Sequence, residues 1–379
     1  MASSKMLSSF VLALGVQSAF GMKVGDFNSQ FADNGASLSI GLSPQVGDLH
    51  SSRKVPEGIV NDEERISSVN SGNHGWTAGH STRFETSTLS DVSKLCGTVL
   101  KGEVHYHELP ERDYGEFEGL ELPAAFDSRD NWKSCTSIGH IRDQSSCGSC
   151  WAFGSTEAFE DRYCIATGKN KLFSTEDTTG CCGFLNCALS MGCNGGQPSG
   201  AWHWFTTTGV VTGGDYDDIG KDDTCKPYTL PPCAHHVKSD KYKACPTQEY
   251  HTPKCTKECS EKTYATGYTE DKAKAKKSFS VNGVENIMKE IMTNGPVTGA
   301  FSVYSDFPTY QSGVYTKTPG ASMLGGHAIK IIGWGTEGGV DYWVVVNSWN
   351  ETWGDGGTFK IKRGTDECGI ESQISAGTF

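Results

Sequence analysis

Gln144-Ser145-Ser146-Cys147-Gly148-Ser149-Cys150-Trp151-Ala152-Phe153 places a cysteine, Cys150, where a helix is expected to begin. Ala152, Phe159 and Tyr163 follow at helical spacing and would share one face. The positive end of a helix dipole lowers the pKa of a thiol and favours the nucleophilic thiolate. The Cys-Gly-Ser-Cys-Trp spacing is typical of such a nucleophile. The stretch therefore predicts a thiol enzyme.

A cysteine nucleophile needs a histidine as base and an Asn or Asp that orients the imidazole. His327 precedes the apolar run 328–332, and Asn347 follows the apolar run 342–346, so each is expected beside a buried strand. A lone histidine on a strand is more often structural. The Cys150 motif upstream and Asn-Ser-Trp downstream favour catalysis.

These blocks resemble the papain family of cysteine proteases, and within it the cathepsin B branch, over residues 122–379 and part of the preceding segment. The resemblance implies an α+β, papain-like fold in which a helical lobe and a β-barrel-like lobe flank the active-site cleft. It makes Cys150 the nucleophile, His327 the acid and base, Asn347 the residue that orients the ring, and Gln144 an oxyanion donor. It also implies substrate-binding positions at Gly195, Gly196, Pro198, Ala300, Ala328 and Trp349.

The pattern of apolar residues agrees with a helical first half and a strand-rich second half of the peptidase domain. Strands are expected at 299–304, 328–332, 342–346 and 358–362. One helix is expected to include Val284, Ile287, Met288 and Ile291 and to end at Asn294-Gly295-Pro296.

The chain begins with features of a secretory signal peptide, expected at residues 1–21. Lys5 precedes an apolar run over residues 6–16 and then small residues. The alternative, a membrane anchor, is disfavoured because this run is too short to span a bilayer. No other run is long enough, so we expect no membrane span.

Residues 22–121 are expected to form a propeptide, loosely ordered over 22–56 and inhibitory over about 57–100. Asn61 and Glu64 have the spacing of a helix cap, with Ile59, Ile66 and Val69 on one face. Trp76 lies in a Trp-x-Ala-Gly block that, with Leu95-Cys96-Gly97-Thr98, resembles the family's propeptide. Trp76 could be an ordinary core aromatic residue, but its flanking glycines favour a role in plugging the active site.

Fifteen cysteines behind a signal peptide predict disulfides. Zinc is the alternative, but only Cys147 and Cys150 have the Cys-x-x-Cys spacing of a structural zinc site. The resemblance implies the pairs Cys135–Cys164, Cys147–Cys193, Cys181–Cys255, Cys182–Cys187, Cys225–Cys259 and Cys233–Cys245. It leaves Cys96, Cys150 and Cys368 as thiols.

His327 lies 177 positions after Cys150 (327 − 150), more than the roughly 130–150 of the family pattern. The surplus matches the Cys-rich stretch of about 225–259, which resembles the occluding loop of the cathepsin B branch. His235 and His236 in it would bind a substrate's C-terminal carboxylate and so favour dipeptide release. A surface pair or a metal ligand is the other interpretation of two adjacent histidines. Asp143 matches the residue that pins the first histidine.

Two departures from the family pattern refine the expected specificity, and one sequon bears on modification. The family's second loop latch pairs an Arg with an Asp, but Lys241 and Thr352 stand here, so more endopeptidase activity is expected. Gln373 replaces an acidic residue at the floor of the S2 pocket, which should favour apolar over arginine side chains at P2. Asn350 begins a glycosylation sequon that we expect to be unused because it adjoins Trp349.

The net charge of −12 argues against a nucleic-acid partner and suits an acidic compartment. The expected product is a monomer without a metal or cofactor, lysosomal or extracellular, that acts on peptide and protein substrates. Its own propeptide and cystatin-type proteins are the expected inhibitors. The rival hypothesis is a catalytically silent homologue that acts as a binding or decoy protein. The complete set of Cys150, His327, Asn347 and Gln144 argues against it.

Overall fold

The computed structural model describes residues 54–103, 105–232, 243, 246 and 248–379. The predicted signal peptide, the start of the predicted propeptide, the histidine pair His235 and His236, the pair Cys233 and Cys245, and Lys241 lie outside these residues. No helix among the described residues is long and apolar enough to cross a membrane.

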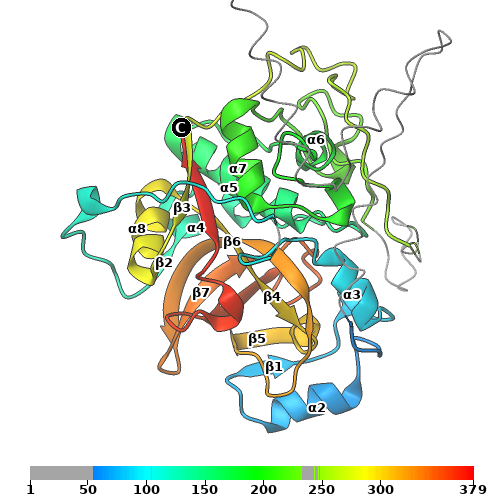
Figure 1. The fold of residues 1–379 in the computed structure, drawn as a ribbon, viewed down its shortest axis with the longest axis vertical. Helices are drawn as coiled ribbons and strands as arrows, with labels where there is room; N and C mark the ends of the chain where they lie inside the picture. The colour runs from blue at the N-terminus through cyan, green and yellow to red at the C-terminus, as the bar shows by residue number, and fades with distance from the viewer. Residues whose placement is uncertain (1–53, 104, 233–242, 244–245, 247) are drawn as a thin grey trace, which may run out of the picture. The chain divides into compact units, whose positions relative to one another are not determined.

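A mixed sheet forms the core of one lobe (Figure 1). Within the described residues its hydrogen-bonded order is β1 (Trp76–Ala78), β5 (Tyr310–Tyr315), β8 (Thr358–Lys362), β7 (Val340–Val346), β6 (Met323–Glu337), β4 (Val297–Tyr304), β9 (Ile374–Thr378) and β3 (Lys277–Val281), with β2 (Phe126–Asp127) paired to β6. The four strands expected from the sequence correspond to β4, β6, β7 and β8. The helix α8 (Val284–Asn294) also occurs where it was expected.

Helices α5 (Cys150–Thr167), α6 (Thr175–Cys181) and α7 (Pro198–Thr207) gather on one side of these strands (Figure 1). A second apolar core, which includes Phe159 and Trp202, holds them together. α5 is buried on nearly all sides, and Gly168 ends it in a left-handed conformation. The α+β class expected from the sequence is thus confirmed.

The two lobes meet where α5 crosses β6. Gly154 in α5 lies so close to β6 that a Cβ there would be 3.1 Å from the backbone of Ile329. This close approach favours glycine, since a Cβ would require the neighbouring strand to shift by a few tenths of an ångström. It brings the N-terminus of α5 near the β6 segment that carries His327.

The residues that precede the peptidase domain, 54–121 and called the upstream segment below, run along both lobes. Helices α2 (Glu63–Ser71) and α3 (Leu89–Leu95) flank β1, which extends the sheet by pairing with β5. The predicted cap at Asn61 is wrong, because Asp62 caps α2 through Arg65 N–H. Asn61 instead bonds the backbone of Ser81. Ile59 is 51% exposed and does not share the buried face.

Candidate active site

Cys150 is the first residue of α5 and is fully buried. Its Sγ lies 3.2 Å from Thr98 Oγ1 of the upstream segment. Burial raises the pKa of the thiol, although the hydroxyl of Thr98 and nearby backbone N–H groups, including that of Ala328, act in the opposite direction. Burial of the Cys150 side chain thus favours the neutral thiol over the thiolate in this state.

His327 lies on β6 and is held by Asn347, directly after β7. Nε2 of the ring and Asn347 Oδ1 are 2.8 Å apart. The same Oδ1 accepts the Ser348 N–H, so it is the amide oxygen and His327 Nε2 must donate. Nδ1 is then the basic nitrogen of the neutral ring. Burial lowers the pKa of His327 to about 4, against the opposing effects of Asn347 and the Leu95 backbone.

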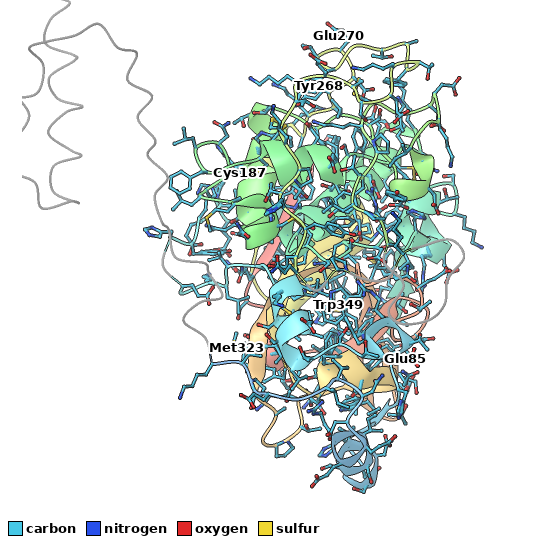
Figure 2. The ribbon with its side chains drawn as sticks, turned by 90° about the vertical axis from the view of Figure 1, so that its right-hand side faces the viewer. Glu85, Cys187, Tyr268, Glu270, Met323 and Trp349 are labelled. Carbon is cyan, nitrogen blue, oxygen red and sulfur yellow. A yellow bond between two sulfur atoms is a disulfide. The ribbon has the colours of Figure 1, made fainter. Side chains whose placement is uncertain are left out.

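Trp349 covers the His327–Asn347 pair. Its ring centroid lies 4.6 Å from that of His327, and the residue is fully buried. Phe84 of the upstream segment packs edge-on against its other side at 5.2 Å. Trp349 lies close to the cyan upstream segment in Figure 2. This cover excludes water from the hydrogen bond that orients the imidazole.

Gln144 is fixed with its amide N–H groups pointing at backbone carbonyls. Ser348 Oγ donates to Gln144 Oε1 at 2.8 Å, which determines the orientation of the amide. Nε2 then donates to Cys147 O at 2.8 Å and to Leu95 O at 3.0 Å. The Leu95 carbonyl of the upstream segment thus accepts a hydrogen bond from Gln144 Nε2, the group that was predicted to donate to an oxyanion.

The upstream segment also pairs with the backbone around the site. Thr98 N–H donates to Gly326 O, and Val99 N–H donates to Gly196 O, both at 3.0 Å. Gly196 N–H donates in turn to Gly97 O at 2.8 Å. At Gly97 a Cβ would lie 1.9 Å from Gly148 O, so only glycine fits there. The predicted position Gly196 thus pairs with the upstream segment, and the backbone N–H of Ala328 lies at the Cys150 thiol.

Other predicted substrate-binding residues lie around this backbone. Gly195 has a φ of +109°, and Pro198 begins α7. Ala300 is buried on β4 opposite Ala328 and donates its N–H to Gln373 O. The Gln373 side chain contacts the upstream segment at both ends, since Nε2 donates to Val99 O and Oε1 accepts from Lys101 N–H.

Asp143 is engaged by three groups. Arg83 of the upstream segment forms a buried ion pair with it at 3.5 Å, and Asn350 Nδ2 and the Ser145 N–H donate to its two oxygens. The Asn350 side chain is thus already used, and its backbone has a φ of +72°. The histidine that Asp143 was predicted to pin lies outside the described residues.

Trp76 does not lie against Cys150, where the predicted plug was expected. It pairs with β5, stacks on Tyr310 and donates its indole N–H to Thr316 O. Leu95, Gly97 and Thr98 make the contacts at the catalytic residues instead. Trp76 is an anchor for the segment, because a large aromatic side chain needs an apolar surface and a partner for its N–H.

Five disulfides occur among the described residues, and they coincide with five of the six pairs that the resemblance implies: Cys135–Cys164, Cys147–Cys193, Cys181–Cys255, Cys182–Cys187 and Cys225–Cys259. The sixth, Cys233–Cys245, lies outside them. Cys96, Cys150 and Cys368 remain thiols. No cluster of three or more metal-ligating side chains occurs in the described part of the chain.

Sequence reasoning missed three functional residues: Thr98, Ser348 and Arg83. Ser348 and Thr98 could have been found, because each stands in a block already singled out, Asn347-Ser348-Trp349 and Leu95-Cys96-Gly97-Thr98. Arg83 acts through a contact between distant segments, and no local pattern signals it.

Comparisons with known proteins identify the family of the chain. Residues 122–378 match the family model described as papain family cysteine protease. The cathepsin B-like cysteine proteinase 6 of Caenorhabditis elegans is 43% identical and covers 84% of this chain and 83% of its own length. Cathepsin B-like cysteine proteinase 5 of the same organism is 46% identical, with 82% and 88% covered.

Among solved structures, procathepsin B S9 from Trypanosoma congolense superposes with a TM-score of 0.71 at 30% identity. The match covers 85% of this chain and 99% of that one. That structure is a proform, so the likeness includes the upstream segment. With this family match, these relatives and a papain-like fold, the chain belongs to the papain family of cysteine proteases.

Proposed function

We propose that the chain is the zymogen of a cathepsin B-like protease, with residues 22–121 as an inhibitory propeptide and 122–379 as the peptidase domain. One observation carries this proposal: two residues of the upstream segment occupy the site. Thr98 Oγ1 contacts Cys150 Sγ, and Leu95 O accepts the hydrogen bond from Gln144 Nε2. A substrate must place its carbonyl carbon beside Cys150 Sγ and its carbonyl oxygen at Gln144 Nε2. Because the propeptide occupies both positions, the substrate cannot bind until the propeptide leaves. Residues 1–21 would direct the chain into the secretory pathway, toward an acidic vesicle or the exterior.

The chemistry after propeptide removal follows from the residues present. Exposure to water relieves the burial of Cys150 and His327, so the thiol proton can move to Nδ1 of His327. Sγ attacks the substrate carbonyl carbon, and the oxyanion is held by Gln144 Nε2–H and Cys150 N–H. His327 then gives its proton to the leaving amine. Water, deprotonated by His327, hydrolyses the thioester and restores the thiol.

The resemblance supports exopeptidase action beside endopeptidase action. His235 and His236 would bind the terminal carboxylate by charge-assisted hydrogen bonds, which are strongest when both rings are protonated. Release of C-terminal dipeptides should therefore be favoured at acid pH. In the zymogen Asp143 is paired with Arg83. It becomes available to His235 only when the propeptide leaves.

The proposal is tested on the processed enzyme with two peptides of one sequence, one with a free C-terminus and one amidated. Mass spectrometry should show dipeptide release from the free peptide at pH 5, much less at pH 7, and little from the amidated peptide. Internal cleavage should occur in both. Cys150→Ala, processed by added wild-type enzyme and then separated from it, should cleave neither peptide, because it lacks the nucleophile.

Two outcomes would overturn the proposal at different levels. Hydrolysis by the separated Cys150→Ala protein would refute the catalytic assignment. Equal cleavage of the free and amidated peptides, with no dipeptide released, would refute the exopeptidase part and leave the endopeptidase.

A further inference from the structure

The upstream segment makes a second contact with the peptidase domain, away from Cys150. Its residues 109–114 run along the edge of β3 that faces away from β9, at one end of the hydrogen-bonded order of the sheet. Ser280 N–H donates to Pro110 O at 2.9 Å, and Arg112 N–H donates to Ser280 O at 3.0 Å. The upstream segment thus covers a strand edge that its removal would expose.

Glu290 on α8 is contacted by the same segment and is fully buried in the intact chain. Its Oε1 accepts a hydrogen bond from Arg162 on α5. Its Oε2 accepts from Arg112 Nη1 at 2.9 Å and from the Tyr114 hydroxyl at 2.8 Å. Within the described residues, both hydrogen bonds to Oε2 therefore come from the upstream segment. Removal of that segment takes two donors from a charged oxygen, which is costly unless other donors replace them.

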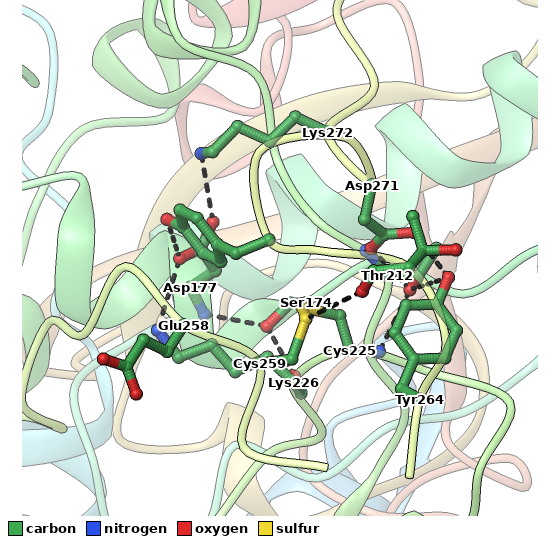
Figure 3. The surroundings of a disulfide bond; sticks show 12 residues. Ser174, Asp177, Thr212, Cys225, Lys226, Glu258, Cys259, Tyr264, Asp271 and Lys272 are labelled. Carbon is green, nitrogen blue, oxygen red and sulfur yellow. Dashed lines mark hydrogen bonds and ion pairs between the residues drawn. A yellow bond between two sulfur atoms is a disulfide. The ribbon is translucent and has the colours of Figure 1, made fainter. Parts of the chain in front are cut away.

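Asp177 in the helical lobe is a carboxylate of the same kind that is complete without the upstream segment. It too is bound by two cations and a tyrosine hydroxyl, which belong to Lys226, Lys272 and Tyr268. Figure 3 shows the two lysines beside it. All three partners belong to the peptidase domain and stay after processing. Glu290 differs, because one cation and the hydroxyl come from residues that processing separates from the domain.

The surroundings of Glu290 suit an arginine. Arg112 Cζ lies 5.0 Å from the ring centroid of Phe279 on β3, and the Arg112 side chain is only 16% exposed. A planar guanidinium can stack on an aromatic ring while it donates to a carboxylate, which the ammonium group of lysine does less well. The peptidase domain thus supplies a carboxylate, an aromatic face and a strand edge to the same peptide.

These groups lie away from the catalytic residues. Arg162 stands 12 positions after Cys150 on α5 (162 − 150), which is about 18 Å along the helix axis. In Figure 1, α8 and β3 lie on the left, whereas α3, which leads to the contacts at Cys150, lies on the right. A peptide bound at Glu290 therefore leaves the catalytic thiol uncovered.

We propose that the processed enzyme has a docking site at β3 and Glu290 for an extended peptide in which a tyrosine follows two positions after an arginine. The occupant is residues 105–121 of this chain, retained after cleavage separates them from the inhibitory contacts at Leu95 and Thr98. The peptide backbone adds to the edge of β3, and the arginine and tyrosine supply the two donors to Glu290 Oε2. The inference rests on the proposed zymogen, since only processing separates this segment from the rest of the chain.

The test uses processed enzyme, purified free of propeptide fragments, with a peptidyl chloromethyl ketone on Cys150. The cleft is then filled, so an added peptide is neither cleaved nor bound there. Isothermal titration calorimetry measures the Kd of synthetic peptides of residues 105–121. The wild-type peptide should bind one to one. Arg112→Ala should weaken binding at least about tenfold and Tyr114→Phe about threefold to tenfold, because each peptide loses a hydrogen bond to a carboxylate. Glu118→Ala, which removes an exposed charge, is the control and should keep the wild-type Kd.

Retention is checked by native mass spectrometry of freshly processed wild-type enzyme, which should show a fragment from residues 105–121 bound to it. Absence of this fragment, no binding of the wild-type peptide, or equal Kd values for the wild-type and Arg112→Ala peptides would overturn the proposal. An equal loss with Glu118→Ala would do the same. An unprocessed chain as active as the processed enzyme would instead refute the proposed zymogen and leave the peptide affinities unchanged, so the two failures are distinguishable.

Discussion

At the scale of single residues, the proposed catalytic residues are oriented by neighbours that themselves need no reactivity. Ser348 bonds the Gln144 side chain through its hydroxyl and Asn347 through its N–H. One residue thus helps to position both the oxyanion donor and the group that holds His327. The sequence predicts the types of the proposed catalytic residues, since the chemistry of a thiol nucleophile demands them. Their orientation could not, because it depends on hydrogen bonds between segments that meet only in the fold.

Gln373 leads to a prediction about specificity. It is nearly buried and uncharged, so the processed enzyme should cleave a reporter with Phe at P2 more efficiently than one with Arg. Gln373→Glu should raise kcat/KM for the Arg reporter by about tenfold, since a charge-assisted bond to a guanidinium contributes about 1.5–3 kcal/mol. Gln311→Glu, a charge added on β5, is the matched control. Equal or better cleavage of the Arg reporter by the wild type would contradict this account.

At the scale of elements, strands could be predicted well and the path of the upstream segment could not. Residues 328–332 of β6 are buried without interruption and residues 343–346 of β7 are apolar and mostly buried, so both strands contain an apolar stretch that can be recognised in the sequence. Asp62, and not the predicted Asn61, caps α2. The side chain of Asn61 is already bonded to the backbone of Ser81. The predicted location of Trp76 at the active site was wrong, because it packs against β5. Flanking glycines indicate that a side chain packs closely, but they do not indicate which surface it packs against.

Gly97 provides a test of the inhibitory contact. Gly97→Ala would place a Cβ 1.9 Å from Gly148 O, so the upstream segment must lift away from Cys150. The unprocessed variant should hydrolyse an endopeptidase reporter at least about tenfold faster than the unprocessed wild type, as a loss of about 1.4 kcal/mol in binding implies. Gly115→Ala, where a Cβ meets only the Asp113 side chain at 3.4 Å, is the control. Equal activity of the Gly97 and Gly115 variants would show that the contact does not inhibit.

At the scale of the whole molecule, buried carboxyl groups on α5 link stability to pH. Desolvation raises the pKa of Glu157 and of Glu160 to about 8, despite the opposing effect of Arg142 and Lys330. The folded state thus keeps protons that the unfolded chain releases above about pH 4.5. The free energy of unfolding should therefore fall as pH rises from about 4.5 to 8. Such a protein is most stable in an acidic compartment.

Thermal unfolding of the processed, inhibitor-blocked enzyme checks this dependence. The Tm should be about 4–8 °C lower at pH 8 than at pH 5, which corresponds to about 2 kcal/mol for a domain of this size. Glu160→Gln should reduce this difference, because its side chain cannot ionise. A Tm that is equal or higher at pH 8 would contradict the assignment of these carboxyl groups as protonated.

We propose that Cys150 is the nucleophile and that residues 54–121 keep it unreactive. Alkylation by iodoacetamide at pH 6, followed by peptide mapping, measures this directly on the intact and processed chains. Burial raises the pKa of Cys150 and lowers that of His327 in the intact chain, so labelling should be at least about tenfold faster after processing, when the thiolate can form. Activity should disappear in proportion to label on Cys150. Equal labelling rates before and after processing, or loss of activity with the label on another cysteine, would contradict the account.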